Sequence, residues 1–451
     1  MPSTKTAVIG AGITGLTTAS KLQSMGEQVV VFEKNKEPGG SVRTVKQDGW
    51  LTEYGPNTLL LKDASVRDFI RETGLESEQI TANESASKRF IVRNGKLEPL
   101  PTSMVEAITT DVFDTPGKLR VLLEPFISRY KGEEESVASF VERRLGREIL
   151  DYGLNPFVAG IYANRPEYLS LKYAFPAMYN LEQEYRSLVW GAIAGSGKRK
   201  QEGRIPRKLI SFKNGLQQLP NKIAQKLMAI HYETKVQSVQ KKTEGWYVLT
   251  DSGESGPFEN VIVNVPVYQW NEDLLPVKEY SDDLTQTIKY PPLSVLHLGY
   301  RKEDIRHPLD GFGFLVPEKE QRKVLGALFS STLFEGRAPQ NHHLLTVFIG
   351  GGREPKKAKL STNKLIEMTE GELKKLIGLK GPHRFKEHVY WPYAIPGYHI
   401  GYGDILEKFD AMERENPGLY LAGNFRNGIS VPDCIKNGME LAKRVRAAGQ
   451  D

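Results

Sequence analysis

Three glycines near the N-terminus have the spacing that a nucleotide-binding loop requires. Gly10, Gly12 and Gly15 follow the short apolar run Ala7–Ile9 in the pattern G-x-G-x-x-G. The first glycine permits a tight turn, the second lets a pyrophosphate approach the backbone, and the third lets a helix pack closely on a strand. The free N–H groups and the positive dipole at the start of the next helix favour phosphate. The pattern therefore predicts binding of a dinucleotide.

An acidic residue follows at the distance expected for the ribose of that dinucleotide. Apolar residues recur at helical spacing after Gly15, a second apolar run spans Val29–Phe32, and Glu33 comes directly after it. A carboxylate at this position accepts hydrogen bonds from a ribose diol and repels the 2′-phosphate of NADP. Strand, helix, second strand and acid are all in register for a βαβ unit, which makes the motif more specific than its glycines alone.

A second glycine pair indicates which dinucleotide binds. Gly39-Gly40 and Arg43, read with Glu33, resemble the E-x-x-x-x-x-G-G-x-x-R segment of the flavoprotein oxidase and desaturase superfamily. In that superfamily the pair extends the pyrophosphate site and marks FAD rather than NAD. Without the resemblance, Gly39-Gly40 would be an ordinary loop.

The C-terminal segment contains another strand–glycine–helix pattern. Gly418–Asn424 predicts a strand that runs into a glycine turn, and Ser430 and Pro432 suit the N-cap and first turn of a helix that continues to about Ala447. In the superfamily the N-terminus of this helix points at the N1–C2 edge of the flavin, where its dipole favours the negative charge of the reduced ring. The single cysteine, Cys434, lies within the helix start and not in an exposed loop like the one that carries a covalent flavin in some amine oxidases. This position and the resemblance to flavoprotein oxidases that bind FAD non-covalently imply a non-covalent cofactor.

The composition excludes several classes of protein. The 451 residues are 39% hydrophobic and 26% charged, which predicts a soluble globular chain of two or three domains. One cysteine allows no intrachain disulfide, and the eight histidines show no metal-ligand spacing, so no metal is expected. We find no apolar run of about 18 residues and no signal-peptide pattern. The net charge of +6 is scattered, which favours an anionic small substrate or an acidic membrane surface over nucleic acid.

Segments in the middle of the chain resemble protoporphyrinogen oxidases. In family order these are Arg89–Ser103, Glu134–Gly146, Val158–Pro176 and Phe212–Pro220. Family-like motifs are distributed from residue 6 to residue 440, so the resemblance covers nearly the whole chain. It implies an FAD-dependent oxidase that converts protoporphyrinogen IX into protoporphyrin IX in heme biosynthesis, with dioxygen as the electron acceptor. The alternatives are coproporphyrinogen III, whose four propionates favour a more cationic pocket, and, more distantly, an amine oxidase or a carotenoid desaturase.

The same resemblance assigns four residues to the porphyrinogen. Arg89 matches the arginine that pairs with a propionate, and a guanidinium suits bidentate recognition of a carboxylate. Leu315 and Phe334 match apolar positions that sandwich the pyrrole rings, although by pattern alone both would be core residues. Asn57 lies in the Gly-Pro-Asn segment, near where flavin and substrate meet in the family. No catalytic triad is expected, because the flavin accepts hydride and the protein orients the substrate.

The predicted FAD contacts come from both ends and the middle of the chain. Val236 would act through its backbone, which any residue could supply. The full set is Gly10, Ala11, Gly12, Ile13, Thr14, Gly15, Glu33, Lys34, Gly40, Ser41, Arg43, Gly55, Pro56, Asn57, Thr58, Val236, Trp391, Gly423, Asn424, Ile429, Ser430 and Val431.

These residues must be positioned by elements that are far apart in sequence. We predict an α/β fold: a Rossmann-type FAD-binding domain (1–84, 204–270 and 396–451), an α+β substrate domain (85–103 and 271–395), and a mostly helical inserted domain (104–203). Within them the patterns predict a helix over Ser65–Thr73, a hairpin turning at Asn94-Gly95, strands at Ser294–Tyr300 and Leu344–Phe348, and an amphipathic helix over Thr362–Ile377.

The helical domain carries the expectations about partners and location. In the resembled family this region associates with membranes, and members without spanning helices lie on the bilayer or are soluble. Lys198-Arg199-Lys200, within the linker-like segment Gly195–Gly203, could touch anionic lipid, but a solvated loop is favoured. We expect a cytoplasmic protein. The sequence leaves open peripheral contact with the inner face of the cell membrane and assembly into a homodimer.

Overall fold

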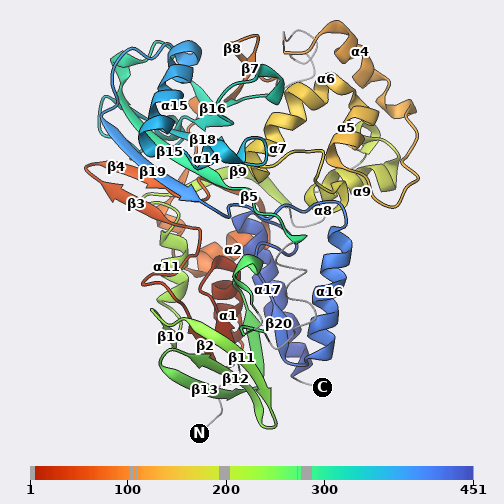
Figure 1. Cartoon of the computed structure of the whole chain (residues 1–451), viewed down its shortest axis with the longest axis vertical. Coiled ribbons are helices and arrows are strands. Elements are labelled where there is room, and N and C mark those ends of the chain that lie inside the picture. The colour runs from red at the N-terminus through yellow and green to blue at the C-terminus, as the bar shows by residue number, and fades with distance from the viewer. Residues whose placement is uncertain are drawn as a thin grey trace.

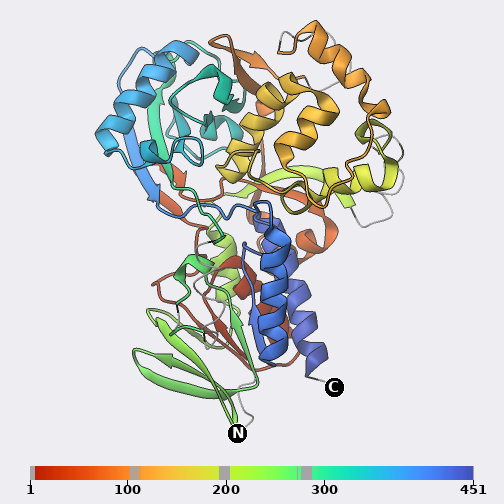
Figure 2. The ribbon, with the colours of Figure 1, turned by 45° about the vertical axis from the view of Figure 1, so that its right-hand side comes forward.

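The structure is a computed structural model of the chain, and it describes residues 6–101, 106, 110, 112–191, 194, 204–271, 273–275 and 287–449. A narrow lower lobe carries both ends of the chain, below a broader upper lobe (Figure 1). Turned by 45°, the upper lobe separates into a half that contains a large sheet and a half that is mainly helical (Figure 2).

A five-stranded parallel sheet forms the centre of the lower lobe. Its order is β10-β2-β1-β14-β20, with every neighbouring pair parallel. The strands come from distant parts of the chain: β1 is Thr6–Ile9, β2 Val29–Phe32, β10 Ile230–His231, β14 Asn260–Val263 and β20 Leu419–Leu421. The central strands are covered on both faces, which explains their continuous apolar runs.

Two helices pack against one face of this sheet and against each other. Helix α1 (Ile13–Ser24) and helix α17 (Val431–Ala448) share a core with Val8 and Ile262. Thr18 Oγ1 donates a hydrogen bond to Gly438 O at 3.2 Å. A Cβ at Gly438 would lie 2.7 Å from Thr14 O, so a glycine is required for this close approach.

The other face of the parallel sheet is covered by a small antiparallel sheet. This sheet has the order β11-β12-β13, and its strands are Val236–Lys242, Gly245–Thr250 and Gly253–Phe258. Trp246 and Phe258 bury their rings in one core with Ala7 and Ile9. Helix α11 (Gln218–Ala224) and helix α16 (Tyr402–Glu415) complete the lobe.

The upper lobe contains a seven-stranded mixed sheet of order β19-β15-β18-β17-β16-β7-β8. Only β7 and β16 pair in parallel. Helix α15 (Thr362–Ile377) packs into the core of this sheet through Leu365 and Leu373. The strands are β7 Lys88–Arg93, β8 Lys96–Pro99, β15 Leu293–Arg301, β16 Gly311–Leu315, β17 Gly326–Leu328, β18 His342–Gly350 and β19 Phe385–Trp391.

Two smaller sheets lie between the lobes. One has the order β5-β9-β6 (Leu59–Asp63, Arg204–Phe212 and Gln79–Thr81), and the other pairs β3 with β4 (Thr44–Gln47 and Trp50–Glu53). The indole of Trp50 stacks on Phe385 with ring centroids 5.0 Å apart. The β3–β4 hairpin therefore contacts the seven-stranded sheet directly.

The helical half surrounds a buried ion cluster. Arg144 is fully buried and pairs with Glu124 at 2.9 Å and with Glu182 at 2.6 Å. Helix bounds here are α4 Thr115–Leu122, α5 Val137–Leu145, α6 Arg147–Ile149, a π-helical turn Leu150–Leu154, α7 Asn155–Tyr162, α8 Leu171–Ala174 and α9 Pro176–Tyr185. Among the described residues, no helix is long and apolar enough to cross a membrane.

The α/β fold class expected from the sequence is confirmed, and the helix over Thr362–Ile377 has the predicted bounds. The turn at Asn94-Gly95 has positive φ at both residues, as a two-residue hairpin turn requires. The six domain ranges stay a prediction. The linker segment with Lys198-Arg199-Lys200 lies outside the described residues.

Candidate active site

The two glycine-rich loops lie side by side at the carboxyl edge of the parallel sheet. Gly12 and Gly39 form an isolated parallel bridge, and Gly39 N donates to Ala11 O at 2.8 Å. A Cβ at Gly40 would lie 3.6 Å from Gly12 Cα. The structure therefore joins the two motifs into one continuous backbone surface.

Glu33 forms hydrogen bonds to the first glycine loop, to the segment after β2 and to the segment before β11. Its Oε2 accepts a hydrogen bond from Ala11 N at 2.7 Å, and its Oε1 accepts one from Asn35 N at 2.9 Å. Thr234 N donates to the backbone oxygen of Glu33 at 2.9 Å, which brings the start of β11, and hence Val236, to this corner. Lys34 is exposed nearby and donates to Gln269 Oε1 at 2.9 Å.

Asn264 holds the first loop and was missed by the sequence reasoning. Its Nδ2 donates to Gly10 O at 3.1 Å. A Cβ at Gly15 would lie 2.5 Å from Asn264 Nδ2, and one at Gly10 would lie 2.7 Å from Asn264 O. The available signal was its place directly after the buried strand β14. The loop thus has room only for backbone, which fits a pyrophosphate bound by backbone N–H groups.

The N-terminus of α17 lies at the same edge, because β20 runs parallel to β14 and β1. Ser430 is the N-cap and its Oγ accepts from Asp433 N at 3.2 Å. The preceding turn is fixed by Tyr398, whose hydroxyl donates to Asn424 O at 2.7 Å. Gly423, at φ 147°, makes the turn out of β20, and the flanking Ile429 and Val431 are half-buried.

The segment after β4 is fixed between both lobes. Trp391 Nε1 donates to Tyr54 O at 2.9 Å, and Tyr54 N donates to Arg43 O at 2.9 Å. A Cβ at Gly55 would lie 2.0 Å from Ser41 O, so only glycine fits there. Residues 55–58 are half-buried and start beside the second glycine loop.

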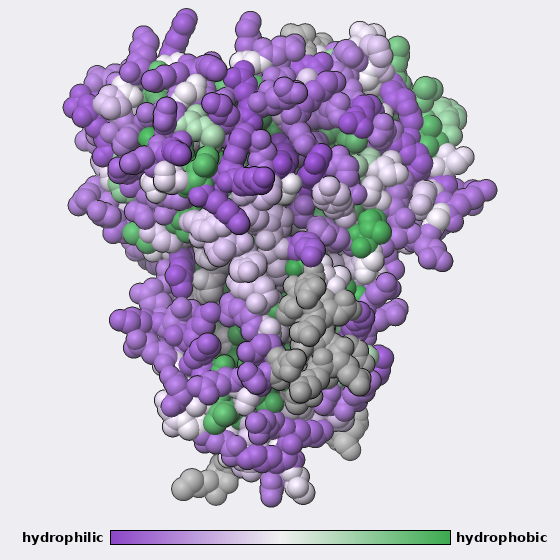
Figure 3. All heavy atoms as spheres, in the orientation of Figure 1, coloured by the Kyte–Doolittle hydropathy of each residue, from purple (hydrophilic) through white to green (hydrophobic). Residues whose placement is uncertain are grey.

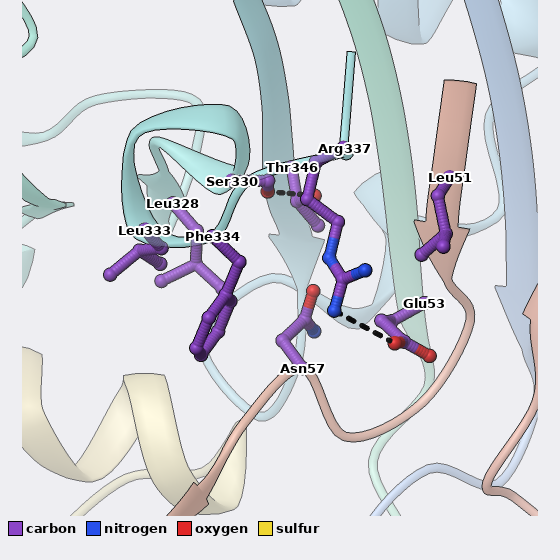
Figure 4. A pocket seen from close by; sticks show the side chains of 9 residues that line it. All are labelled: Leu51, Glu53, Asn57, Leu328, Ser330, Leu333, Phe334, Arg337 and Thr346. Carbon is purple, nitrogen blue, oxygen red and sulfur yellow. Dashed lines mark hydrogen bonds and ion pairs between the residues drawn. The ribbon is translucent and has the colours of Figure 1, made fainter. Parts of the chain in front are cut away.

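A small cavity adjoins this segment (Figure 4). It contains two of the four predicted substrate residues, Asn57 and Phe334. Ser330 and Thr346 join their hydroxyls at 2.8 Å on its wall. The lining is Leu51, Glu53, Asn57, Leu328, Ser330, Leu333, Phe334, Arg337 and Thr346.

Glu53 and Arg337 face each other in this cavity with a closest distance of 3.8 Å. Burial raises the pKa of Glu53 to about 7, although hydrogen bonding by Thr44, the charge of Arg337 and the Leu216 N–H all oppose the shift. Burial also lowers the pKa of Arg337, and Glu53 opposes that. The sequence reasoning missed both residues. Glu53 stands two positions before Gly55, whereas Arg337 had no pattern that could identify it.

The other two predicted substrate residues lie on neighbouring strands of the upper sheet. Arg89 on β7 is exposed, and its guanidinium carbon lies 5.5 Å from the ring centroid of Phe312. Phe312 packs in one apolar cluster with Phe334. Leu315 on β16 packs against Gly160 of α7, where an added Cβ would lie 2.9 Å from Leu315 Cδ2. The substrate and cofactor roles of the individual residues stay predictions.

The described residues contain no group of three His, Cys, Asp or Glu side chains that could hold a metal ion. Cys434 is buried, and burial raises its pKa to about 12. A thiol with this pKa is a poor nucleophile at neutral pH. This agrees with non-covalent cofactor binding.

Comparison with known proteins places the chain in a family. The family model described as flavin containing amine oxidoreductase matches residues 13–446. A crystal structure of an Exiguobacterium sp. 255-15 protein shares the fold, with a TM-score of 0.81, 21% identity and 99% coverage of both chains. The chain therefore belongs to the flavin-containing amine oxidoreductases, and its cofactor is FAD.

Within that class the chain belongs to the protoporphyrinogen oxidase family. Protoporphyrinogen oxidase 2, chloroplastic/mitochondrial, of Arabidopsis thaliana is 36% identical, over 98% of this chain and 93% of the relative. Coproporphyrinogen III oxidase of Bacillus subtilis (strain 168) is 26% identical, over 96% of this chain and 95% of the relative. The protein is an FAD-dependent oxidoreductase.

Proposed function

We propose that the protein oxidises protoporphyrinogen IX to protoporphyrin IX in heme biosynthesis, with dioxygen as the electron acceptor. The observation that carries the proposal is the 36% identity to a protoporphyrinogen oxidase over nearly the full length of both chains. When bound, FAD supplies a two-electron hydride acceptor. The residues of the chain bind and orient the porphyrinogen and accept the protons that it releases.

An exposed cation near the predicted substrate residues supports an acidic substrate. Arg89 is exposed beside Phe312, which packs in one apolar cluster with Phe334. An exposed guanidinium pairs with a propionate, and apolar side chains contact the pyrrole rings. An amine oxidase would instead need acidic groups to attract a cationic amine.

Coproporphyrinogen III is the second candidate substrate, because a relative at 26% identity bears that name. Its four propionates would require more cationic partners than the two of protoporphyrinogen IX. The lower identity of that relative favours protoporphyrinogen.

The function is tested by anaerobic mixing of the purified holoenzyme with each porphyrinogen. We expect protoporphyrinogen IX to bleach the flavin absorbance, and admission of dioxygen to restore it. Comparing the rates of bleaching by the two porphyrinogens decides between them. If neither substrate bleaches the flavin, the proposal is wrong.

We also propose that α4 and the residues after it dock on an anionic membrane surface in the cytoplasm. Leu119, Leu122 and Leu123 are exposed, and Phe126 is 85% exposed. Figure 3 shows apolar atoms gathered at the upper right, over the position of α4 in Figure 1. Arg129 and Lys131 follow and are exposed. Apolar side chains flanked by basic ones suit the interface of an acidic bilayer.

A further inference from the structure

The cavity beside Asn57 has the size and polarity to bind one water molecule. The space open to the centre of a water molecule is about 10 Å³, near the lower limit of ~10–15 Å³ for holding one. Apolar cavities of this kind stay dry, whereas polar ones bind water. The polar side chains of this cavity are those of Glu53, Asn57, Ser330, Arg337 and Thr346.

Arg337 has a hydrogen-bond donor that no described protein group satisfies. The side chain is 3% exposed, and its Nη2 donates to Ser211 Oγ at 2.6 Å and Phe212 O at 3.3 Å. Its Nη1 is buried and has no partner among the described residues. Figure 4 shows one terminal nitrogen of the guanidinium on the dashed line to Glu53 and the other directed to the side of Leu51, which also lines the cavity. On folding, a buried donor without a partner loses its hydrogen bond to water and gains none in return. The unpaired Nη1 therefore indicates that a ligand binds in the cavity.

Two donors hold the Glu53 carboxylate in place, while its burial favours the protonated form. Thr44 Oγ1 accepts from Gln217 N at 3.1 Å and therefore donates its own proton to Glu53 Oε2 at 2.6 Å. Leu216 N donates to Oε1 at 2.9 Å. The 3.8 Å to Arg337, the charged group that faces the carboxylate, is too long for a hydrogen bond. Because burial raises its pKa to about 7, Glu53 exchanges protons near neutral pH.

We propose that Glu53 takes up the proton that the porphyrinogen releases with each hydride, through one water bound by Arg337 in this cavity. The inference rests on the proposed function. In each two-electron oxidation a C–H bond and an N–H bond of the porphyrinogen break. FAD, when bound, would supply the acceptor for the hydride, and the N–H proton passes to the water. The water gives a proton to the Glu53 carboxylate, which later releases it to solvent. Asn57 and Phe334 line the same cavity, so the predicted substrate position adjoins the acceptor.

The pH dependence of turnover by Glu53→Gln tests this role. In the wild type we expect kcat/KM to fall about tenfold per pH unit below an apparent pKa near 7, because protonated Glu53 cannot accept a proton. We expect Glu53→Gln to lower kcat/KM on the order of 100-fold or more and to lose this acid limb. Glu27→Gln serves as the control, because Glu27 lies far away in the lower lobe and pairs with Arg446. This variant should keep the wild-type kcat/KM and its fall at low pH.

Arg337→Gln separates a proton-transfer role from a structural one. The charge of Arg337 lowers the pKa of Glu53, so its removal should move the acid limb to higher pH. A merely structural change would lower the rate without moving the limb. The inference is overturned if the fall of kcat/KM at low pH has the same apparent pKa in Arg337→Gln as in the wild type. It is also overturned if an active Glu53→Gln still shows this fall.

Infrared titration of the oxidised holoenzyme without substrate provides a readout independent of turnover. We expect a protonated-carboxyl band that titrates near pH 7 in the wild type and is missing from Glu53→Gln. A wild type without such a band overturns the inference, even if Glu53→Gln fails to fold. A wild type that shows the band but oxidises neither porphyrinogen contradicts the proposed function instead.

Discussion

Glu33 Oε2 accepts a 2.7 Å hydrogen bond from the backbone N–H of Ala11, inside the glycine-rich loop. The carboxylate is thus oriented by the same loop that is predicted to hold the pyrophosphate, so ribose and phosphate recognition are coupled. We expect Glu33→Gln to weaken FAD binding roughly 10- to 100-fold, because a hydrogen bond to a charged group contributes about 1.5–3 kcal/mol. Titrating FAD into apoprotein measures this, and Glu27→Gln should bind as the wild type does.

Arg89→Ala should raise KM for the porphyrinogen while the FAD content stays near that of the wild type. The exposed guanidinium on β7 lies over Phe312, outside the glycine loops, so its loss should affect the substrate alone. Loss of a charge-assisted hydrogen bond predicts an increase of roughly 10- to 100-fold. Arg67→Ala, on the exposed surface of α2 (Ala64–Glu72), is the matched control. Loss of FAD from Arg89→Ala would show that Arg89 has been assigned to the wrong ligand.

The pKa of Glu53 also predicts how stability depends on pH. The pKa of the Glu53 carboxyl is 4.5 in the unfolded chain and about 7 in the native protein. The native state therefore binds the proton more tightly. The corresponding contribution to stability is present below pH 4.5 and is lost as the pH rises through 7. It amounts to roughly 3 kcal/mol, at about 1.4 kcal/mol per pKa unit. Glu53→Gln has no carboxyl at this position, so its stability should not fall in this way as the pH rises.

Urea unfolding of the apoprotein at about pH 5 and about pH 8 measures the effect. Relative to the wild type, Glu53→Gln should be more stable at the higher pH than at the lower one. The same relative stability at both pH values would mean that the native pKa of Glu53 is ordinary.

The exposed surface of α4 predicts binding to vesicles. Leu122→Asp with Phe126→Asp should lower co-sedimentation with anionic vesicles roughly tenfold or more, since each side chain loses about 1.5–3 kcal/mol of apolar burial. Met228→Asp, at an 89% exposed position in the lower lobe, controls for added charge. The membrane proposal is wrong if the wild type does not co-sediment with vesicles and is a dimer in solution. If Phe126→Asp dissociates that dimer, this surface is a dimer interface.

The elements that local pattern determines could be predicted from the sequence. The glycine spacing, the strand Val29–Phe32, the Ser430 N-cap and the helix Thr362–Ile377 all depend on neighbouring residues, and the structure has them. The meeting of Gly12 with Gly39 followed from the superfamily resemblance.

Contacts between distant segments could not be predicted in this way. Asn264 and Arg337 have no local pattern that distinguishes them from other polar residues. Each became visible only when folding placed it beside a partner more than 250 residues away: Gly10 for Asn264 and Glu53 for Arg337. Likewise, Glu53 gains its raised pKa from burial between the two lobes, which its own strand does not reveal.

The five-stranded sheet takes strands from residue 6, from residue 260 and from residue 419. On a ribosome, the first glycine loop emerges long before β20 and α17, whose N-terminus lies at the same edge of the sheet. The nascent chain must therefore expose or shield an incomplete sheet until β20 and α17 have been made. A product truncated before residue 419 lacks both elements, so retained flavin would distinguish chains that contain them from shorter fragments.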